Sequence, residues 1–409
     1  MNRLPAGLAA CMALSAPALA EDSRLETQFQ LGWESEYEGN FDLDDDDRAD
    51  VNAHELTLRG TLRYRHSETV RARLEAEAAL IRDYTQGERV DRIERLKINQ
   101  AWIGIEAYDG GEIQLGRFQL RDPREWLFDE NLDGLRLLHE GGRVAFDLSL
   151  SRADMWHRDL LDPRSTGEPV NNLAALADVE VRDGLWLGGY AVLRDDRSKG
   201  DRSGRDRPLH LGLRSHGALT GAVEHWADLA FVRGTDGTRP LRGHALTAGA
   251  TWTLGARRLT LGYAWASGDD DPQDNRNTEF RQTGLQSNEG RFGAGSKLSY
   301  YGAGFDPELS NMAILTAGLG MNPTETLALD LVYNRFRQVE ASDTLRDSAL
   351  DADPDGISRD LGEEIDLVLT YEPDEDREFQ LVLGYFRPGD AFGAADDALY
   401  ARLEFELRF

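Results

Sequence analysis

Basic side chains recur at alternate positions in three neighbouring stretches of the chain. They are Arg59, Arg63, Arg71, Arg73, Arg95 and Lys97. A guanidinium group offers a planar pair of N–H donors that matches a carboxylate, and several such groups along one path attract a polyanion. These residues are therefore candidate ligands of an anion, while a ladder of cross-strand ion pairs explains the same residues without a ligand.

The residues between these basic positions are mostly apolar, which indicates strands with two unlike faces. In the stretch 54–65 the leucines, such as Leu56, take even positions and Arg59 takes an odd one. Successive side chains of a strand point to opposite faces. A charge facing lipid costs roughly 2–4 kcal/mol at mid-membrane, so the basic set must face inward if these strands cross a membrane. The same rule predicts that Trp102, which shares its parity with Leu96, faces lipid.

Later stretches carry acids rather than bases at their polar positions. These acids are Asp178, Glu180, Asp228, Asp330, Glu364, Asp366, Glu404 and Glu406. The interior is therefore predicted to have a basic wall and an acidic wall.

The last stretch of the sequence, 399–409, alternates strictly between apolar and polar residues and stops at Phe409. A long amphipathic strand at a chain terminus would be an exposed edge, which invites aggregation. A closed barrel removes that edge by pairing the last strand with the first. The terminal aromatic residue also resembles the end of bacterial outer-membrane barrels.

Long and short connections alternate between these stretches. The first five predicted strands cover 24–36, 54–65, 69–82, 92–107 and 112–121. The whole chain gives nine long and eight short connections, hence eighteen strands, and the short ones carry turn residues such as Gly-Gly and Asp-Gly. An even strand count with tight turns on one side is typical of outer-membrane barrels. We predict an all-β fold, a transmembrane antiparallel β-barrel of outer-membrane type with 18 strands, as a single domain over 21–409.

The first twenty residues have the features of a signal peptide. Arg3 precedes a short apolar centre, and Ala18-Leu19-Ala20 is a cleavage signal. Cys11, the one cysteine of the chain, lies inside this leader, so no disulfide is expected after cleavage. The net charge of −28 disfavours nucleic-acid binding, which needs a basic surface.

Signals for catalysis and for metal binding are few. No H-E-x-x-H, G-x-S-x-G or P-loop motif occurs, so an enzyme is not expected. Asp351, Asp353 and Asp355 lie at alternate positions before Gly356, as at the start of a calcium loop. The twelfth position of this loop is Gly362 rather than an acid, so the EF-hand pattern is incomplete. The three acids are candidate ligands of a structural calcium ion, and no other cofactor is expected.

Several longer motifs resemble the alginate-export family of outer-membrane porins. They are Gly-Arg-Phe-Gln at 116–119, Asp-Pro-Arg-Glu-Trp at 122–126, Asp-Glu-Asn-Leu-Asp-Gly-Leu-Arg-Leu at 129–137, Phe-Arg-Gln-Thr-Gly-Leu-Gln-Ser-Asn at 280–288, Asp-Pro-Glu-Leu-Ser-Asn at 306–311 and Tyr-Phe-Arg-Pro-Gly-Asp-Ala-Phe at 385–392. The resemblance implies an eighteen-stranded monomer that exports an anionic polyuronate. It also implies an arginine-lined constriction that inward-folded loops narrow.

The resemblance adds candidate substrate-binding residues. They are Arg281, Arg117, Arg121, Arg124, Arg136 and Arg387, with Asp129, Glu130 and Asp133 as acids that fix those arginines by ion pairs. Arg117 shares its parity with apolar Leu115, so it faces inward only if a bulge shifts the register or if it lies above the membrane. Trp126 either stacks on a sugar or, as an interface residue, lies at the edge of the bilayer.

The sequence thus predicts passive export of an anionic exopolysaccharide, alginate or a similar uronate, through a monomeric channel in the bacterial outer membrane. The expected partners are this polysaccharide, outer-membrane lipid and lipopolysaccharide, and periplasmic export proteins. The many acids leave open a general or small-molecule porin on the same barrel, and a binding or adhesion barrel is a weaker third hypothesis.

Overall fold

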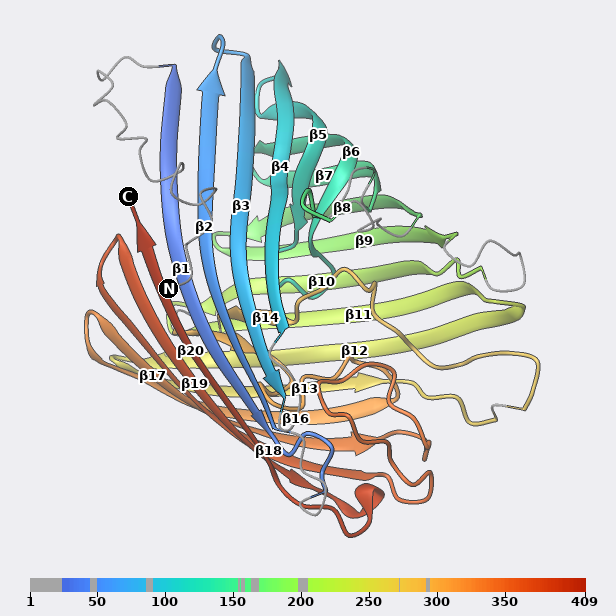
Figure 1. Cartoon of the computed structure of the whole chain (residues 1–409). Helices are drawn as coiled ribbons and strands as arrows, with labels where there is room; N and C mark the ends of the chain where they lie inside the picture. Colours follow the sequence, from blue (N-terminus) through green and yellow to red (C-terminus); the bar gives the residue numbers. More distant parts are fainter. Residues whose placement is uncertain are drawn as a thin grey trace.

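The computed structural model describes residues 24–44, 50–85, 91–153, 155, 159–162, 169–197, 205–271, 273–291 and 295–409. Eighteen strands form one closed antiparallel sheet in which each strand pairs with its neighbours in the sequence (Figure 1). Their bounds are β1 Leu25–Gly39, β2 Val51–Arg65, β3 Val70–Thr85, β4 Asp91–Tyr108, β5 Gly111–Arg121, β6 Asp129–Gly141, β7 Val144–Arg152, β8 Val170–Arg182, β9 Leu185–Asp196, β10 Leu209–Thr220, β11 Val223–Asp236, β12 Arg239–Leu254, β13 Arg257–Ala266, β16 Met312–Thr324, β17 Leu327–Gln338, β18 Asp360–Asp374, β19 Arg377–Pro388 and β20 Ala398–Arg408. The predicted fold is confirmed.

The first and last strands close the barrel, as the alternating C-terminal stretch predicts. β1 pairs with β20 over ten residues, from Gln30 opposite Arg408 to Gly39 opposite Leu399. The backbone N–H of Phe29 donates to the carbonyl of Phe409 at 2.8 Å. The last residue of the chain thus takes part in the closure.

Nine connections lie at one end of the barrel and eight short turns lie at the other, as expected. One outer connection is shorter than the sequence suggests, because β11 and β12 extend to a tight turn at Gly237 and Thr238. Within the described part of the chain, no helix is long and apolar enough to cross a membrane. The predicted signal peptide, 1–20, lies outside the described residues.

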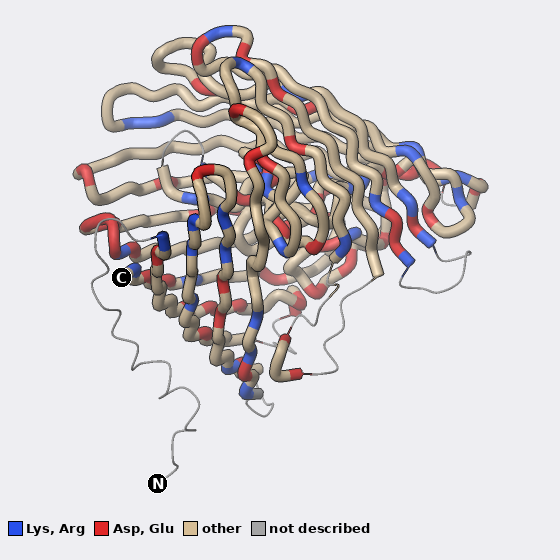
Figure 2. Tube along the Cα trace, turned by 90° about the horizontal axis from the view of Figure 1, so that it is seen from above, with Lys and Arg blue, Asp and Glu red and all other residues tan. Residues whose placement is uncertain are grey.

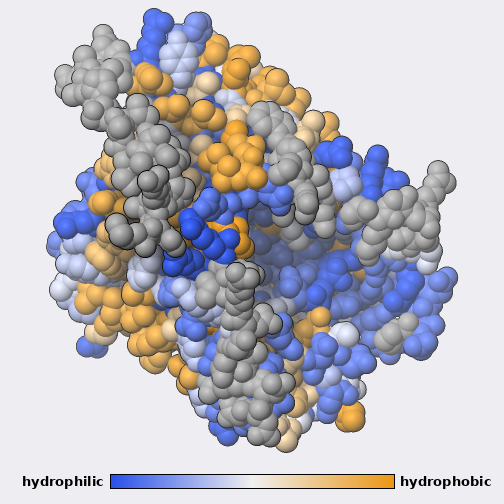
Figure 3. Space-filling model, viewed as in Figure 1, coloured by the Kyte–Doolittle hydropathy of each residue, from blue (hydrophilic) through white to orange (hydrophobic). Residues whose placement is uncertain are grey.

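The two faces of the strands differ as the parity rule requires. Outward side chains are apolar and exposed, such as Leu115 at 65 % and Leu213 at 66 %, while Glu75 on the inner face is 7 % exposed. Charged residues are spaced along the strands in Figure 2, and hydrophilic surface surrounds the central hollow in Figure 3. A closed barrel with an apolar outer face is the architecture that crosses the bacterial outer membrane.

A bulge in β4 changes which side chains face inward. Glu75 of β3 pairs with Gln100, but the next residue, Ala76, pairs with Ile98, so Asn99 is the extra residue. Below this bulge the parity of β4 is reversed. Trp102 therefore lies on the inner face, opposite Arg73, and the prediction that it faces lipid is wrong.

The longest outer connection, 267–311, folds into the barrel and is called the plug below. It includes the short hairpin of β14 (Glu289–Arg291) and β15 (Lys297–Ser299). The hairpin descends far, since Arg291 pairs at 3.3 Å with Glu372, which lies near the short turn between β18 and β19. The buried apolar core combines residues of the plug, the 122–128 loop and the wall with residues of other outer connections, such as Phe41, Leu350 and Ala391.

The plug occupies one side of the barrel. Its backbone and side chains bond to the wall from β9 to β19, for example to Asp330 on β17 and Glu364 on β18. Glu364 is fully buried and accepts the N–H groups of Gly304 and Phe305. On the side formed by β1 to β6, a polar cavity remains beside the plug.

Candidate functional site

A polar cavity of about 480 Å³ runs along the inner face of β1 to β6, and we call it the basic lane. It combines four arginines, six carboxamide side chains, one threonine and two acids. They are Arg59, Arg63, Arg73, Arg121, Gln28, Gln30, Asn99, Gln100, Gln119, Asn131, Thr61, Glu75 and Asp129. Guanidinium groups match carboxylates, and carboxamides both donate to and accept from hydroxyls. The lane therefore has the chemistry to bind an acidic sugar.

Each lane arginine is held by a neighbour. Arg59 donates from Nη2 to Glu77 at 2.7 Å, and Arg121 makes two bonds of 2.8 and 3.0 Å to Asp129. These side chains remain partly open, with 38 % of Arg59 and 48 % of Arg121 exposed. The expected ion pair of Asp129 is thus present. Pairing with these acids lowers the net positive field of the lane.

Strand register explains why these groups meet. β2 and β3 place Arg59 opposite Glu77 and Arg63 opposite Arg73. Two arginines side by side repel, and each turns to another partner. Arg73 pairs with Glu75 on its own strand, while Arg63 donates to Gln28 of β1 at 3.3 Å. Arg63 therefore differs from the other lane arginines in that it donates to a neutral carboxamide.

The acidic wall adjoins the lane. A second cavity, of about 300 Å³, is lined by Arg59 and by six acids, namely Glu34, Glu55, Glu77, Glu378, Glu404 and Glu406. Glu404 and Glu406 confirm the predicted acidic wall on β20. The other predicted acids lie elsewhere on the wall, and several of them are neutralised by buried arginines. Asp330, for example, lies 2.9 Å from Arg258.

Arg95 and Lys97, two further predicted lumen residues, lie on β4 above the bulge. They pair with Ala79 and Glu77 of β3, which are on the inner face, so Arg95 and Lys97 face inward as well. Lys97 also lines a third cavity of about 240 Å³ at the outer end of the lane, together with Glu130 and Arg117.

Arg117 lies where β4 and β5 separate. The pairing of these strands ends with Arg117 opposite Ala101. The preceding residue, Gly116, has a φ of +128°, a conformation that L side chains rarely adopt. Arg117 is 5 % exposed, donates to the carbonyl of Ile98 at 3.2 Å and pairs with Asp133 at 3.3 Å. It bridges the split in the wall, and Asp133 fixes it as expected.

Two other predicted arginines are built into the interior. Arg124 lies 2.8 Å from Asp228 and its guanidinium stacks 4.9 Å from the centroid of Tyr300. Arg136 binds Asp147 through two nitrogens, with a shortest distance of 2.6 Å. Their side chains are only 15 % and 13 % exposed, so they present little surface to a ligand.

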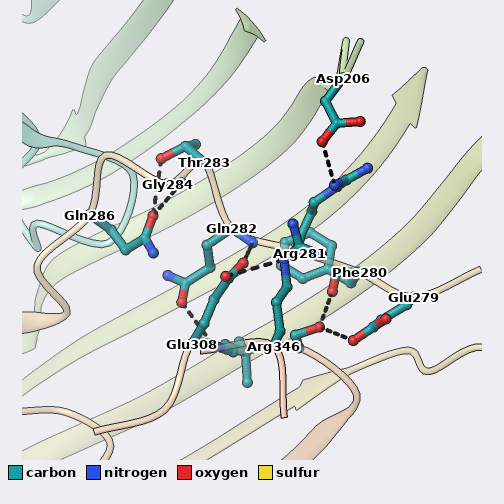
Figure 4. A network of polar contacts seen from close by, with 12 residues as sticks. Asp206, Glu279, Phe280, Arg281, Gln282, Thr283, Gly284, Gln286, Glu308 and Arg346 are labelled. Atoms are coloured by element: carbon teal, nitrogen blue, oxygen red, sulfur yellow. Dashed lines mark hydrogen bonds and ion pairs between the residues drawn. The ribbon is translucent and has the colours of Figure 1, made fainter. Parts of the chain in front are cut away.

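Arg281 is also buried, and it anchors the plug. Its guanidinium lies 3.6 Å from Asp206 of an outer connection (Figure 4). It also lies 3.4 Å from Asp236, the last residue of β11. Its carbonyl oxygen bonds to the His210 ring at 3.0 Å. The side chain is 6 % exposed, so this geometry favours a structural role over contact with cargo.

Glu308 fixes the same part of the plug. Its carboxylate accepts the N–H of Gln282 at 2.7 Å and lies 3.3 Å from Arg346 (Figure 4). Burial raises the pKa of Glu308 to about 7, because the cost of desolvating the charge exceeds the stabilisation from Arg346.

The structure corrects the predicted roles of Arg387 and Trp126. Arg387 is 67 % exposed but shares the outward parity of Leu383 and Tyr385, so it lies on the outer face near the rim, beside Glu363. Trp126 is 2 % exposed and donates to the hydroxyl of Tyr301 at 2.9 Å. It is neither a sugar platform nor an interface residue but part of the core.

The candidate calcium ligands form no metal-binding group. Among the described residues, no three His, Cys, Asp or Glu side chains gather closely enough to hold a metal ion. Asp355 instead accepts the N–H groups of Ile357 and Ser358, which fixes the turn after it. Calcium at Asp351, Asp353 and Asp355 stays a prediction without a formed site.

The structure adds residues to the site that the sequence reasoning missed. The carboxamides of the lane, such as Gln28 and Gln30, lie on the inward parity of their strands and were recognisable by that signal. Trp102 and Gln100 were not, because the bulge at Asn99 leaves no clear mark in the sequence.

Comparison with known proteins agrees with the fold. The alginate production protein AlgE of Pseudomonas aeruginosa is 24 % identical over 378 residues, which cover 77 % of this chain and 74 % of that protein. The crystal structure of Pseudomonas aeruginosa OccK7 (OpdD) superimposes with a TM-score of 0.63 at 15 % identity, covering 95 % of this chain and 99 % of that one. The outer membrane protein OprD of the same species gives a TM-score of 0.59 at 13 % identity, covering 94 % of this chain and 93 % of that one. The family model described as alginate export matches residues 23–405. The chain belongs to the alginate export family of outer-membrane proteins.

Proposed function

We propose that this barrel exports an anionic uronate polymer, alginate or a close relative, through the basic lane. The observation that carries the proposal is the row of Arg59, Arg63, Arg73 and Arg121 beside six carboxamides in one cavity. Arginine binds the carboxylate that every uronate carries, and the carboxamides bind hydroxyls. Family membership and the relative named for alginate production support this cargo.

The partners of the lane arginines suit transport rather than tight binding. Glu77, Glu75 and Asp129 already occupy Arg59, Arg73 and Arg121. A polymer carboxylate must compete with these acids, so each contact is weak and brief. Conduction requires sites of this kind, from which the cargo leaves as readily as it enters.

The transport is passive, and the channel works as a monomer. One chain supplies all eighteen strands and closes the sheet, so the barrel needs no second copy. The gradient of polymer from the periplasm and the field of the lane supply the driving force. The barrel then has no catalytic role and no obligatory cofactor, while calcium and periplasmic export proteins stay predictions.

A general or small-molecule porin is the second candidate. The six acids of the cavity beside the lane favour it, because they would admit cations. The two candidates predict different currents through a planar bilayer.

Reversal potentials in a salt gradient and block by mannuronate oligomers distinguish the two. If the barrel exports a uronate polymer, the channel prefers anions, and the oligomers interrupt the current at concentrations at which neutral glucan oligomers have no effect. A cation-selective channel that is indifferent to mannuronate would refute export and support the porin.

A further inference from the structure

Arg71 and Trp102 form a cluster at the periplasmic end of the barrel that the proposed function does not yet use. The guanidinium carbon of Arg71 lies 5.7 Å from the centroid of the indole ring of Trp102. Arg71 is the second residue of β3 and its ion-pair partner, Glu112, is the second residue of β5, so both lie beside the short turns. The Arg71 side chain is 59 % exposed and Trp102 is half-buried.

The backbone is shaped to hold this cluster on the inner face. The bulge at Asn99 turns Trp102 inward, where its Nε1 donates to Gln100 at 3.2 Å. Gly104 leaves room for Glu112, since a Cβ at this position would lie 2.8 Å from the Glu112 carboxyl carbon. The side chains of Arg71, Trp102 and Glu112 thus come from three neighbouring strands.

The cluster offers an aromatic ring and a cationic group together. A neutral sugar would use only the ring and a simple anion only the cation, whereas a uronate would use both. An indole face packs against the C–H groups of a pyranose ring. The Arg71 guanidinium, which lies over the ring, can bind a carboxylate on the same sugar. Glu112 already holds Arg71, so an incoming carboxylate displaces a carboxylate and the contact stays weak.

We propose that Arg71 and Trp102 form a binding site that captures one uronate residue at the periplasmic mouth and delivers the polymer to the basic lane. We call it the mouth site. It rests on the proposed function, because it assumes a uronate cargo that arrives from the periplasm. Arg73, which pairs across the sheet with Trp102, is the adjacent lane arginine and receives the next carboxylate.

The test measures the residence time of mannuronate oligomers in single channels when they are added to the periplasmic side. Trp102→Ala is expected to shorten the residence time about five-fold, and Trp102→Phe to restore most of it. The matched control is Trp252→Ala, which removes a tryptophan that is 47 % exposed near the periplasmic end of β12. This control is expected to keep the residence time of the original protein.

A second variant keeps the proposal testable if Trp102→Ala fails to insert. Arg71→Lys retains the charge but loses the planar group that stacks on the indole and forks onto a carboxylate. It is expected to shorten the residence time of mannuronate oligomers, while neutral glucan oligomers stay without effect. Suppose that mannuronate blocks the original protein, and that its residence time is the same in Arg71→Lys and in every Trp102 variant that inserts. This result would overturn the mouth site but not the export proposal. Absence of block in the original protein would overturn the export proposal itself.

Discussion

Nη2 of Arg281 lies 3.4 Å from Oδ1 of Asp236, and this pair ties the plug to the outer end of β11. Asp206, on the preceding outer connection, takes the other terminal nitrogen at 3.6 Å. The sequence places Arg281 in a stretch that resembles polyuronate exporters, yet its surroundings are those of a buried anchor. A buried anchor and a cargo contact respond differently to substitution.

Arg281→Ala is expected to loosen the plug rather than to weaken cargo binding. Removing one member of a buried ion pair leaves the other charges unpaired and costs about 3–5 kcal/mol. We expect a larger and noisier conductance in planar bilayers, with mannuronate block retained. Arg276→Ala is the control, because Arg276 lies on the same plug but is 57 % exposed and pairs with Asp274. Loss of block at normal conductance in Arg281→Ala would make Arg281 a cargo contact instead.

Arg63→Gln is expected to weaken mannuronate block about five-fold, since one charge-assisted hydrogen bond to the polymer is lost. Arg63 is chosen because it donates to the neutral Gln28 rather than to an acid, so the substitution perturbs the lane little. Arg387→Gln serves as the control on the outer face, where the side chain is 67 % exposed. Equal block constants for Arg63→Gln and Arg387→Gln would argue against the lane as the path.

Docking of the plug is expected to weaken as the pH rises from 5 to 8. Glu308 has a pKa raised to about 7 from an ordinary value of 4.5, so the folded protein holds this proton more tightly than the unfolded chain does. Its stabilising contribution is complete below the ordinary value and is lost as the pH rises through about 7. The change is on the order of 2 kcal/mol.

Hydrogen exchange of the 300–311 segment measures this effect, with Glu308→Gln compared at each pH to remove the intrinsic pH dependence of exchange. The ratio of exchange rates between the original protein and Glu308→Gln should rise with pH. A ratio that stays constant, or that falls as the pH rises, would show that Glu308 does not couple the plug to protons.

Gly116→Ala is expected to destabilise the barrel by about 2 kcal/mol or more, because a side chain at a φ of +128° is strained. Its Cβ would also clash with the carbonyl oxygen of Ala101. Gly221→Ala is the matched control, since a Cβ there would meet nothing within 4 Å. Urea unfolding in detergent measures the difference in stability between the two variants. Equal unfolding midpoints for Gly116→Ala and Gly221→Ala would show that the backbone at Gly116 is not what separates β4 from β5.

The barrel was predictable because its rules are local. Alternating parity in β2 and β3 correctly predicts that Arg59, Arg63, Arg71 and Arg73 face inward, since neither strand contains a register shift in their mutual pairing. The alternation of long and short connections gives the strand count, because each connection joins two strands that are also neighbours in the sheet.

The corrections come from features that are not local. One extra residue, Asn99, reverses the parity below it and places Trp102 inside. Trp126 is buried by Phe280 and Tyr301, which are more than 150 residues away in the sequence. Arg387 is different, because its own strand parity, shared with Tyr385, already indicates the outer face. For Arg387, the resemblance of residues 385–392 to the family predicted substrate binding, whereas the alternation along β19 predicts the outer face.

The path of the polymer can be located directly with a single introduced thiol. Cys11 is the one cysteine of the chain, so in a Cys11→Ser background Gln28→Cys places a lone thiol in the lane beside Arg63. The rate at which a charged thiol reagent modifies this cysteine is measured with and without mannuronate oligomers. If the lane carries the cargo, mannuronate slows modification at position 28, a neutral glucan does not, and a cysteine at Leu383 on the outer face is unaffected. Equal rates at position 28 with and without mannuronate would contradict the claim that the polymer passes through the lane.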